Sequence, residues 1–155
     1  MKSIAPLLIS ASTVALAGFL LSAPARAAPP VPLPVAGEIA GMADIPVEEW
    51  TAMAAGRTLT YRINGEVWAR EYYYPGTNHV SLQRPNGQCM NGTWEYTAPH
   101  YCYHWDLEGT ACFRHVRGED AIWVIQTEMG VDTPQVQEMS GISDVPLICA
   151  PQGTS

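Results

Sequence analysis

The sequence predicts a mainly β fold, in which one short N-terminal helix precedes an antiparallel up-and-down meander of about seven strands. We expect these strands to form a curled sheet or a small barrel. Three observations carry this prediction: a helical segment around residue 50, two Asn-Gly turns between β-rich runs, and further turn signals at short intervals. All five tryptophans and all seven tyrosines lie between residues 50 and 123, so we expect the core there.

The helix is predicted within DIPVEEWTAMAAGRT, residues 44–58. A proline and two glutamates suit its first turn, where a missing N–H costs little and negative charge is favourable. Trp50, Met53 and Ala54 form an apolar face at helical spacing, and Gly56 is a natural end. We expect this short helix to plug or flank the sheet.

The first hairpin is predicted by the Asn-Gly dipeptide at residues 64–65, because this dipeptide favours two-residue turns. Such a turn would pair Tyr61 with Trp68 across the hairpin. A second Asn-Gly turn is expected at residues 86–87. The later strands are expected from the runs NGTWEY, HYCYHWD, ACFRHV and AIWVIQTEM, which cover 91–96, 100–106, 111–116 and 121–129.

Beyond residue 129 the strand signals weaken. Residues 130–144, GVDTPQVQEMSGISD, have the composition of a loop. Residues 145–150, VPLICA, are expected to form a last short strand.

Residues 1–27 have the features of a Sec-type signal peptide. A positive start and an apolar core precede Ala25 and Ala27, which occupy the −3 and −1 positions of a cleavage site after Ala27. We expect residues 28–43 to form a Pro/Ala-rich flexible leader and residues 44–155 a single β-rich domain. No second apolar segment is long enough to span a bilayer. These features predict a periplasmic or secreted protein.

Four cysteines follow the signal peptide: Cys89, Cys102, Cys112 and Cys149. An even number in an exported chain indicates two disulfides, with three connectivities open. Cys102 and Cys112 flank a short connection and can face each other across it. Cys89 would then pair with Cys149 and hold the C-terminal tail against the sheet. No pair has the C-x-x-C spacing of a thioredoxin-like redox site.

Removal of the signal peptide leaves six arginines, no lysine and fifteen acidic residues, which gives a net charge of −9. This balance argues against binding to nucleic acid or to an anionic membrane surface, because both require basic patches. It is compatible with a basic protein or a cationic ligand as partner.

Several short motifs occur in a fixed order: EEW, GRT, YRINGEVWAREYY, C-x-x-G-T-W at residues 89–94, YCYHW and CFRHV. This set resembles a family of small exported proteobacterial β-proteins of unknown function. Members share a helix ending in Gly-x-Thr, an aromatic EYY-x-x-G strand, a GTW strand and C-[YFW] strands. The resemblance covers roughly Glu48 to Val124. It implies a β fold and export, and it implies no activity and no catalytic residues.

Candidate metal ligands cluster in PHYCYHWD, residues 99–106. In a strand, His100, Cys102, His104 and Asp106 share one face, while the three aromatic residues between them share the other. Positions four residues apart in a strand lie about 13 Å apart, so these four side chains cannot converge on one ion without a bend.

A weaker metal set would combine His104 and Asp106 with His115 from the following strand. Cys102 is expected to be oxidised, and His115 has the opposite strand parity to Cys112, so it would face the other side. We therefore expect neither a metal ion nor another cofactor.

Alternation in EYYYPG places Tyr72 and Tyr74 on one face of a strand and Glu71 and Tyr73 on the other. One buried face cannot hide every ring, and an exposed tyrosine suits recognition. The candidate ligand or partner surface consists of Tyr72, Tyr74, His104 and Asp106.

The sequence contains no G-x-S-x-G nucleophile elbow, and its paired carboxylates fall in turns. It therefore favours a non-enzymatic binding or accessory protein. One alternative is an inhibitor of a basic cell-wall hydrolase, because strong acidity steers a protein towards a cationic enzyme. The other is a metal-dependent hydrolase that uses His100, His104 and His115.

Overall fold

The computed structural model describes residues 36–149, which belong to one compact unit. The expected signal peptide, the first part of the expected leader and the C-terminal residues 150–155 lie outside the described residues. The elements are α1 (Ala36–Ala40), β1 (Ala43–Asp44), α2 (Val47–Ala54), β2 (Thr58–Ile63), β3 (Glu66–Tyr73), β4 (His79–Gln83), β5 (Cys89–Thr97), β6 (His100–Trp105), β7 (Gly109–Arg117), β8 (Ile122–Glu128) and β9 (Val131–Ser143). No helix among the described residues is long and apolar enough to cross a membrane.

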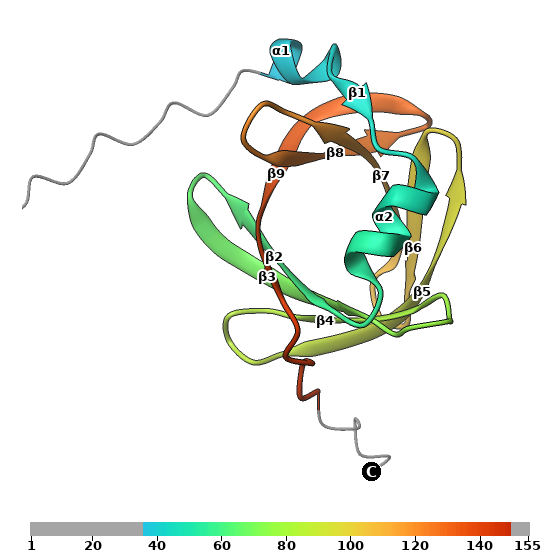
Figure 1. Ribbon diagram of the computed structural model, residues 1–155, viewed down its shortest axis with the longest axis vertical. Coiled ribbons are helices and arrows are strands. Elements are labelled where there is room, and N and C mark those ends of the chain that lie inside the picture. The colour runs from blue at the N-terminus through green and yellow to red at the C-terminus, as the bar shows by residue number, and fades with distance from the viewer. Residues whose placement is uncertain (1–35, 150–155) are drawn as a thin grey trace, which may run out of the picture. The chain divides into compact units, whose positions relative to one another are not determined.

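Strands β2 to β9 form a closed, antiparallel up-and-down barrel of eight strands. Each strand pairs with the next one along the chain, and β9 pairs with β2 to close the ring, which Figure 1 shows. The two-residue strand β1 adds to one end of β7. The prediction of a mainly β domain with a helix, a meander and a small barrel is confirmed, with one more barrel strand than expected.

The additional strand is β9, which occupies the segment that the sequence predicted to be a loop. It pairs with both β8 and β2. A last strand was expected at residues 145–150, but the described part of that segment, 145–149, contains none. Pro134 is accommodated because the ladder to β8 is irregular there: three residues, 133–135, stand opposite the single residue Gln126. The inner face of β9 includes polar residues such as Gln137, so the strand lacks the usual apolar alternation.

The first hairpin has the predicted Asn64-Gly65 turn, but its register differs from the prediction. Both turn residues have positive φ, 52° and 83°, as a two-residue hairpin turn of this kind requires. A β-bulge then shifts the ladder, so that Tyr61 pairs with Ala69 and not with Trp68. The bulge lets Trp68 and Glu71, which have opposite parity, both face the barrel interior.

Helix α2 closes one end of the barrel, as expected for a plug. Its Trp50 is fully buried and lies against Tyr73, with ring centroids 5.9 Å apart, and against His115 at 4.0 Å. The helix ends before Gly56, whose φ is +76° and whose N–H donates to the carbonyl of Tyr73. Figure 1 shows α2 within the ring of strands.

Helix α1 lies within residues 28–43, the expected flexible leader, so residues 36–40 form a helix in that segment. Ile39 is 1% exposed and packs with Val116, Trp123 and Ile125. These three strand residues alternate with inward-facing neighbours, so their cluster covers the outer face of the barrel.

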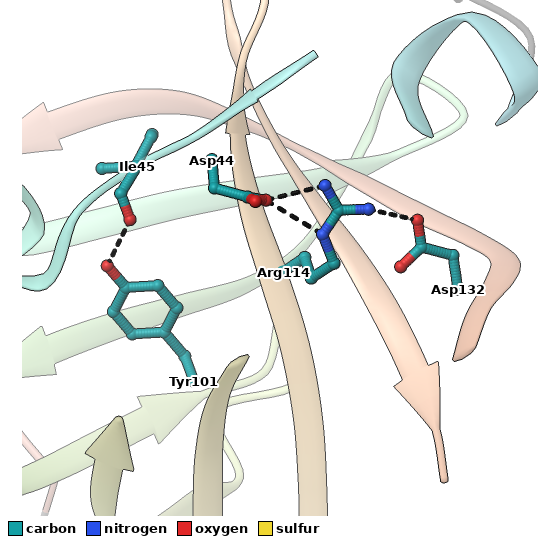
Figure 2. A network of polar contacts seen from close by, with 5 residues as sticks. All are labelled: Asp44, Ile45, Tyr101, Arg114 and Asp132. Atoms are coloured by element: carbon teal, nitrogen blue, oxygen red, sulfur yellow. Dashed lines mark hydrogen bonds and ion pairs between the residues drawn. The ribbon is translucent and has the colours of Figure 1, made fainter. Parts of the chain in front are cut away.

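A polar network fixes the segment that leads into α2. Figure 2 shows Arg114, which donates two hydrogen bonds to Asp44 Oδ1, at 2.9 and 2.7 Å, and one to Asp132 Oδ2 at 2.6 Å. The hydroxyl of Tyr101 donates to the carbonyl of Ile45 at 2.8 Å. The network therefore joins β1, β7 and the start of β9 beside the plug.

The two disulfides are Cys102–Cys112 and Cys89–Cys149. Cys102 and Cys112 are direct partners in the β6–β7 ladder. The other bridge attaches the segment after β9 to the start of β5. This pairing is one of the three connectivities that the sequence leaves open, and two disulfides are consistent with an oxidising environment.

Candidate functional site

The barrel encloses a cavity of about 530 Å³ at the end away from α2. Its rim includes Asn64, in the turn after β2, and Glu108, in the turn after β6. Helix α2 precedes the start of β2, so the turn at Asn64 and the plug lie at opposite ends of that strand. Cavities of 300–1,000 Å³ are typical of sites for small organic ligands, and an eight-stranded barrel is wide enough to hold one such ligand.

Aromatic side chains form much of the cavity wall. Trp68, Tyr103, Trp105 and Phe113 all line it. The rings of Tyr103 and Trp105 are stacked, with centroids 5.9 Å apart and 6° between their planes. The indole N–H of Trp68 donates to the side-chain oxygen of Gln137 at 3.0 Å, which holds that indole in place.

One of the buried polar groups along the cavity is the carboxyl group of Glu71, in β3. Glu71 is 4% exposed and lies in the barrel interior because it shares the inner face with Ala69 and Tyr73. Its Oε2 accepts two hydrogen bonds, from the hydroxyl of Tyr73 at 2.6 Å and from that of Tyr61 at 2.9 Å. Its Oε1 accepts no hydrogen bond from any described residue.

The hydrogen bonds continue from Glu71 across the barrel. Because the hydroxyl proton of Tyr73 is directed to Glu71, the contact of 2.7 Å between Tyr73 and Tyr103 is a donation by Tyr103. Nε2 of His115 lies 3.5 Å from the hydroxyl of Tyr103, at the far end of the chain. Four strands, β2, β3, β6 and β7, thus contribute to one buried polar network.

Burial sets the protonation of this network. Burial raises the pKa of Glu71 to about 7, although the hydrogen bonds from Tyr73 and Tyr61 lower that pKa. Burial also lowers the pKa of His115 to about 3. The pKa values of Tyr61, Tyr73 and Tyr103 lie well above their ordinary value, again through burial first and then through the charge of Glu71. Glu71 is therefore the member of this network that changes charge near neutral pH.

The predicted recognition residues lie outside the barrel, away from this cavity. Tyr72 and Tyr74 face outward with their rings 4.9 Å apart, and Tyr74 is 40% exposed. Tyr74 and Asp106 line one shallow groove on the outer surface. His104 is exposed. Its Nε2 lies 3.2 Å from Oε1 of Glu95, and its Nδ1 lies 2.9 Å from Oγ1 of Thr110.

The weak metal candidates are not brought together. His104 and Asp106 lie on the outer side of the barrel, whereas His115 is 1% exposed inside it, stacked on Tyr101 at 4.0 Å. His100 is the partner of Arg114 in the β6–β7 ladder. Among residues 36–149, no three His, Cys, Asp or Glu side chains are close enough to hold a metal ion.

Sequence reasoning missed Glu71 and Trp68 as site residues. The signal for Glu71 was present, because its parity places a carboxyl group on the same face as Tyr73 in an otherwise apolar pattern. Trp68 could not be placed in the same way, because the bulge that turns it inward has no sequence marker.

The fold and the cavity define the class of protein as a small up-and-down β-barrel with an internal cavity at the end opposite α2. No family model matches the chain, and neither the curated proteins nor the solved structures contain a significant match.

Proposed function

We propose that this protein is an exported, non-enzymatic binding protein that takes a small organic ligand into its barrel. The observation that carries the proposal is the cavity itself, about 530 Å³ in volume, lined by aromatic rings and by a buried carboxyl group with one uncommitted oxygen. A barrel needed only for stability would be filled by side chains along its whole length.

The second part of the proposal is the location of the protein. The N-terminal segment directs the chain to the Sec pathway, cleavage after Ala27 releases it, and the protein acts in the periplasm or outside the cell. The two disulfides support this location, because they persist in oxidising compartments.

A neutral fluorescent probe tests the proposal. N-phenyl-1-naphthylamine gains fluorescence in apolar sites, and we expect one molecule to bind to each purified, oxidised protein molecule. Ala111→Trp places a large ring into the cavity from β7, and Gln126→Trp does the same from β8. Both blocked variants should bind the probe at least tenfold more weakly.

The matched control is Thr110→Trp, which adds the same ring on the outer face, one residue from Ala111. It should bind as the wild type does. Circular dichroism and thermal unfolding verify that each variant is folded. A wild-type protein that leaves the probe unbound, or folded blocked variants that bind it normally, would contradict the proposal.

A further inference from the structure

The charge of the cavity is the first step towards the chemistry of its ligand. Among the described residues, no arginine or lysine lines the cavity, whereas Glu71 lies inside it and Glu108 at its rim. Glu108 pairs with Arg84 outside the cavity, at 2.6 Å. An anionic ligand would enter a low-dielectric space next to a carboxylate without a compensating charge, which is costly.

The second step is the hydrogen-bonding capacity of Glu71. Oε2 already accepts from two tyrosines, while Oε1 accepts from no described residue. A ligand N–H directed at Oε1 would complete the coordination of this carboxylate, and a positive charge on that nitrogen would strengthen the bond. A neutral apolar ligand would leave the same oxygen without a partner, at a cost in affinity.

The third step is the wall around the ligand. The faces of tryptophan and tyrosine rings attract cations, and Trp68, Tyr103 and Trp105 line the same cavity as Glu71. These rings also provide apolar surface for a hydrocarbon or aromatic body. Acid and aromatic rings together select for an organic cation over an inorganic one.

We infer that the ligand of this barrel is a protonated amine on an apolar or aromatic body, whose ammonium group donates to Oε1 of Glu71. This inference rests on the proposed function of the cavity and names the chemistry of its ligand.

Binding is expected to be coupled to pH through Glu71, because a bound cation favours the carboxylate. The titratable and charged groups that face Glu71 are Tyr61 from β2, Tyr73 from β3, Tyr103 from β6 and His115 from β7, with Glu108, paired to Arg84, at the rim. The tyrosines stay protonated and His115 stays neutral between pH 6 and 8, given the directions of their pKa shifts. Since the pKa of Glu71 is about 7, amine affinity should fall about tenfold from pH 8 to pH 6.

The experiment displaces N-phenyl-1-naphthylamine with matched ligand sets. Each set has one body, benzyl, naphthylmethyl or n-octyl, carrying an amine, an alcohol or a carboxylate, so that every amine is an alkylamine and is protonated between pH 6 and 8. We expect at least one amine to bind tenfold or more tightly than its alcohol, and the carboxylates to bind most weakly. Calorimetry in two buffers of different ionisation enthalpy should show about one proton released per amine bound at pH 6.

Glu71→Gln keeps the side-chain volume and removes the charge. It should lose the preference for amine over alcohol and the pH dependence, while Glu66→Gln, an exposed acid on the same strand, should keep both. The inference is overturned if no amine binds more tightly than its alcohol, if Glu71→Gln keeps the preference, or if wild-type affinity is flat from pH 6 to 8. In each of these cases binding of the neutral probe still supports the proposed function, whereas failure of the probe overturns both.

Discussion

Glu71 and Tyr73 lie two residues apart on β3, and their side chains meet inside the barrel through a hydrogen bond of 2.6 Å. This contact joins an acid that burial would keep protonated to a donor that favours its ionised form. The balance leaves the carboxyl group with a pKa of about 7, so its charge changes near neutral pH.

The stability of the protein should therefore depend on pH through Glu71. Its folded-state pKa of about 7 lies above the ordinary value of 4.5, so the folded state holds a proton that the unfolded state releases. Relative to Glu71→Gln, the wild type should lose about 3 kcal/mol of unfolding free energy as the pH rises from 4.5 to above 7. Urea unfolding at pH 4.5, 6 and 8 measures this, with Glu66→Gln as the control. Parallel profiles for the wild type and Glu71→Gln would contradict the assignment.

At acid pH, His115 should make the unfolding free energy depend on pH in the opposite direction. Its folded-state pKa of about 3 lies below the ordinary 6.5, so the unfolded state binds a proton that the folded state cannot hold. Relative to His115→Phe, the wild type should lose about 5 kcal/mol of unfolding free energy as the pH falls from 6.5 to 3. The same denaturation series, extended to pH 3, tests this. If the wild type and His115→Phe lose the same unfolding free energy as the pH falls, His115 binds a proton as readily in the folded state as in the unfolded state, which would contradict the prediction.

Gly92, in β5, should not tolerate a side chain. A Cβ there would overlap the backbone carbonyl of His104 and lie 2.9 Å from the ring of Trp105. Gly92→Ala should therefore cost about 1–3 kcal/mol of unfolding free energy through overpacking. Gly141→Ala is the matched control in β9, because its Cβ would meet Thr60 at an ordinary 3.8 Å. Thermal unfolding of the two variants should differ clearly; equal melting temperatures would refute the close approach.

The contributions of the two disulfides to the free energy of unfolding should differ from the values that their loop lengths alone suggest. Chain-entropy arguments give about 3 kcal/mol for Cys102–Cys112, with a separation of 10 residues, and about 4 kcal/mol for Cys89–Cys149, with a separation of 60. The segment before Cys149 is poorly buried, since Val145 is 71% and Ile148 is 91% exposed.

That segment can fray in the folded state once its bridge is removed, which lowers the cost of removal. Paired serine variants, compared by urea unfolding, should therefore show that loss of Cys89–Cys149 costs no more than loss of Cys102–Cys112. A larger cost for the longer loop would mean that the tail is held firmly by contacts other than its disulfide.

Local turn chemistry accounts for most of what the sequence could predict of the fold. The Asn64-Gly65 turn, the end of α2 before Gly56 and the inner face of Glu71 and Tyr73 all follow from backbone preferences and strand alternation. The sequence did not predict how the barrel closes. Strand β9 closes it by pairing with β2 and β8, and its own residues lack the alternation that would mark a strand.

The cavity was hidden from the sequence for a related reason. A cavity forms where the inward-facing side chains are too short to fill the space around the barrel axis. Packing between strands that are far apart in the chain determines where this happens. Alternation places Tyr72 and Tyr74 on one face of the strand, which is the outer face of the barrel, but alternation alone could not indicate that the opposite face borders a cavity.

The plug formed by α2 has a kinetic consequence. Trp50 fills one end of the barrel in the part of the chain that the structure describes, so the proposed ligand would enter and leave at the other end, through a doorway whose rim includes Asn64 and Glu108. Both directions then cross the same barrier, so a substitution that narrows the doorway without touching the bound ligand slows capture and release by the same factor. Residence time could thus be adjusted at the rim while the dissociation constant stays fixed.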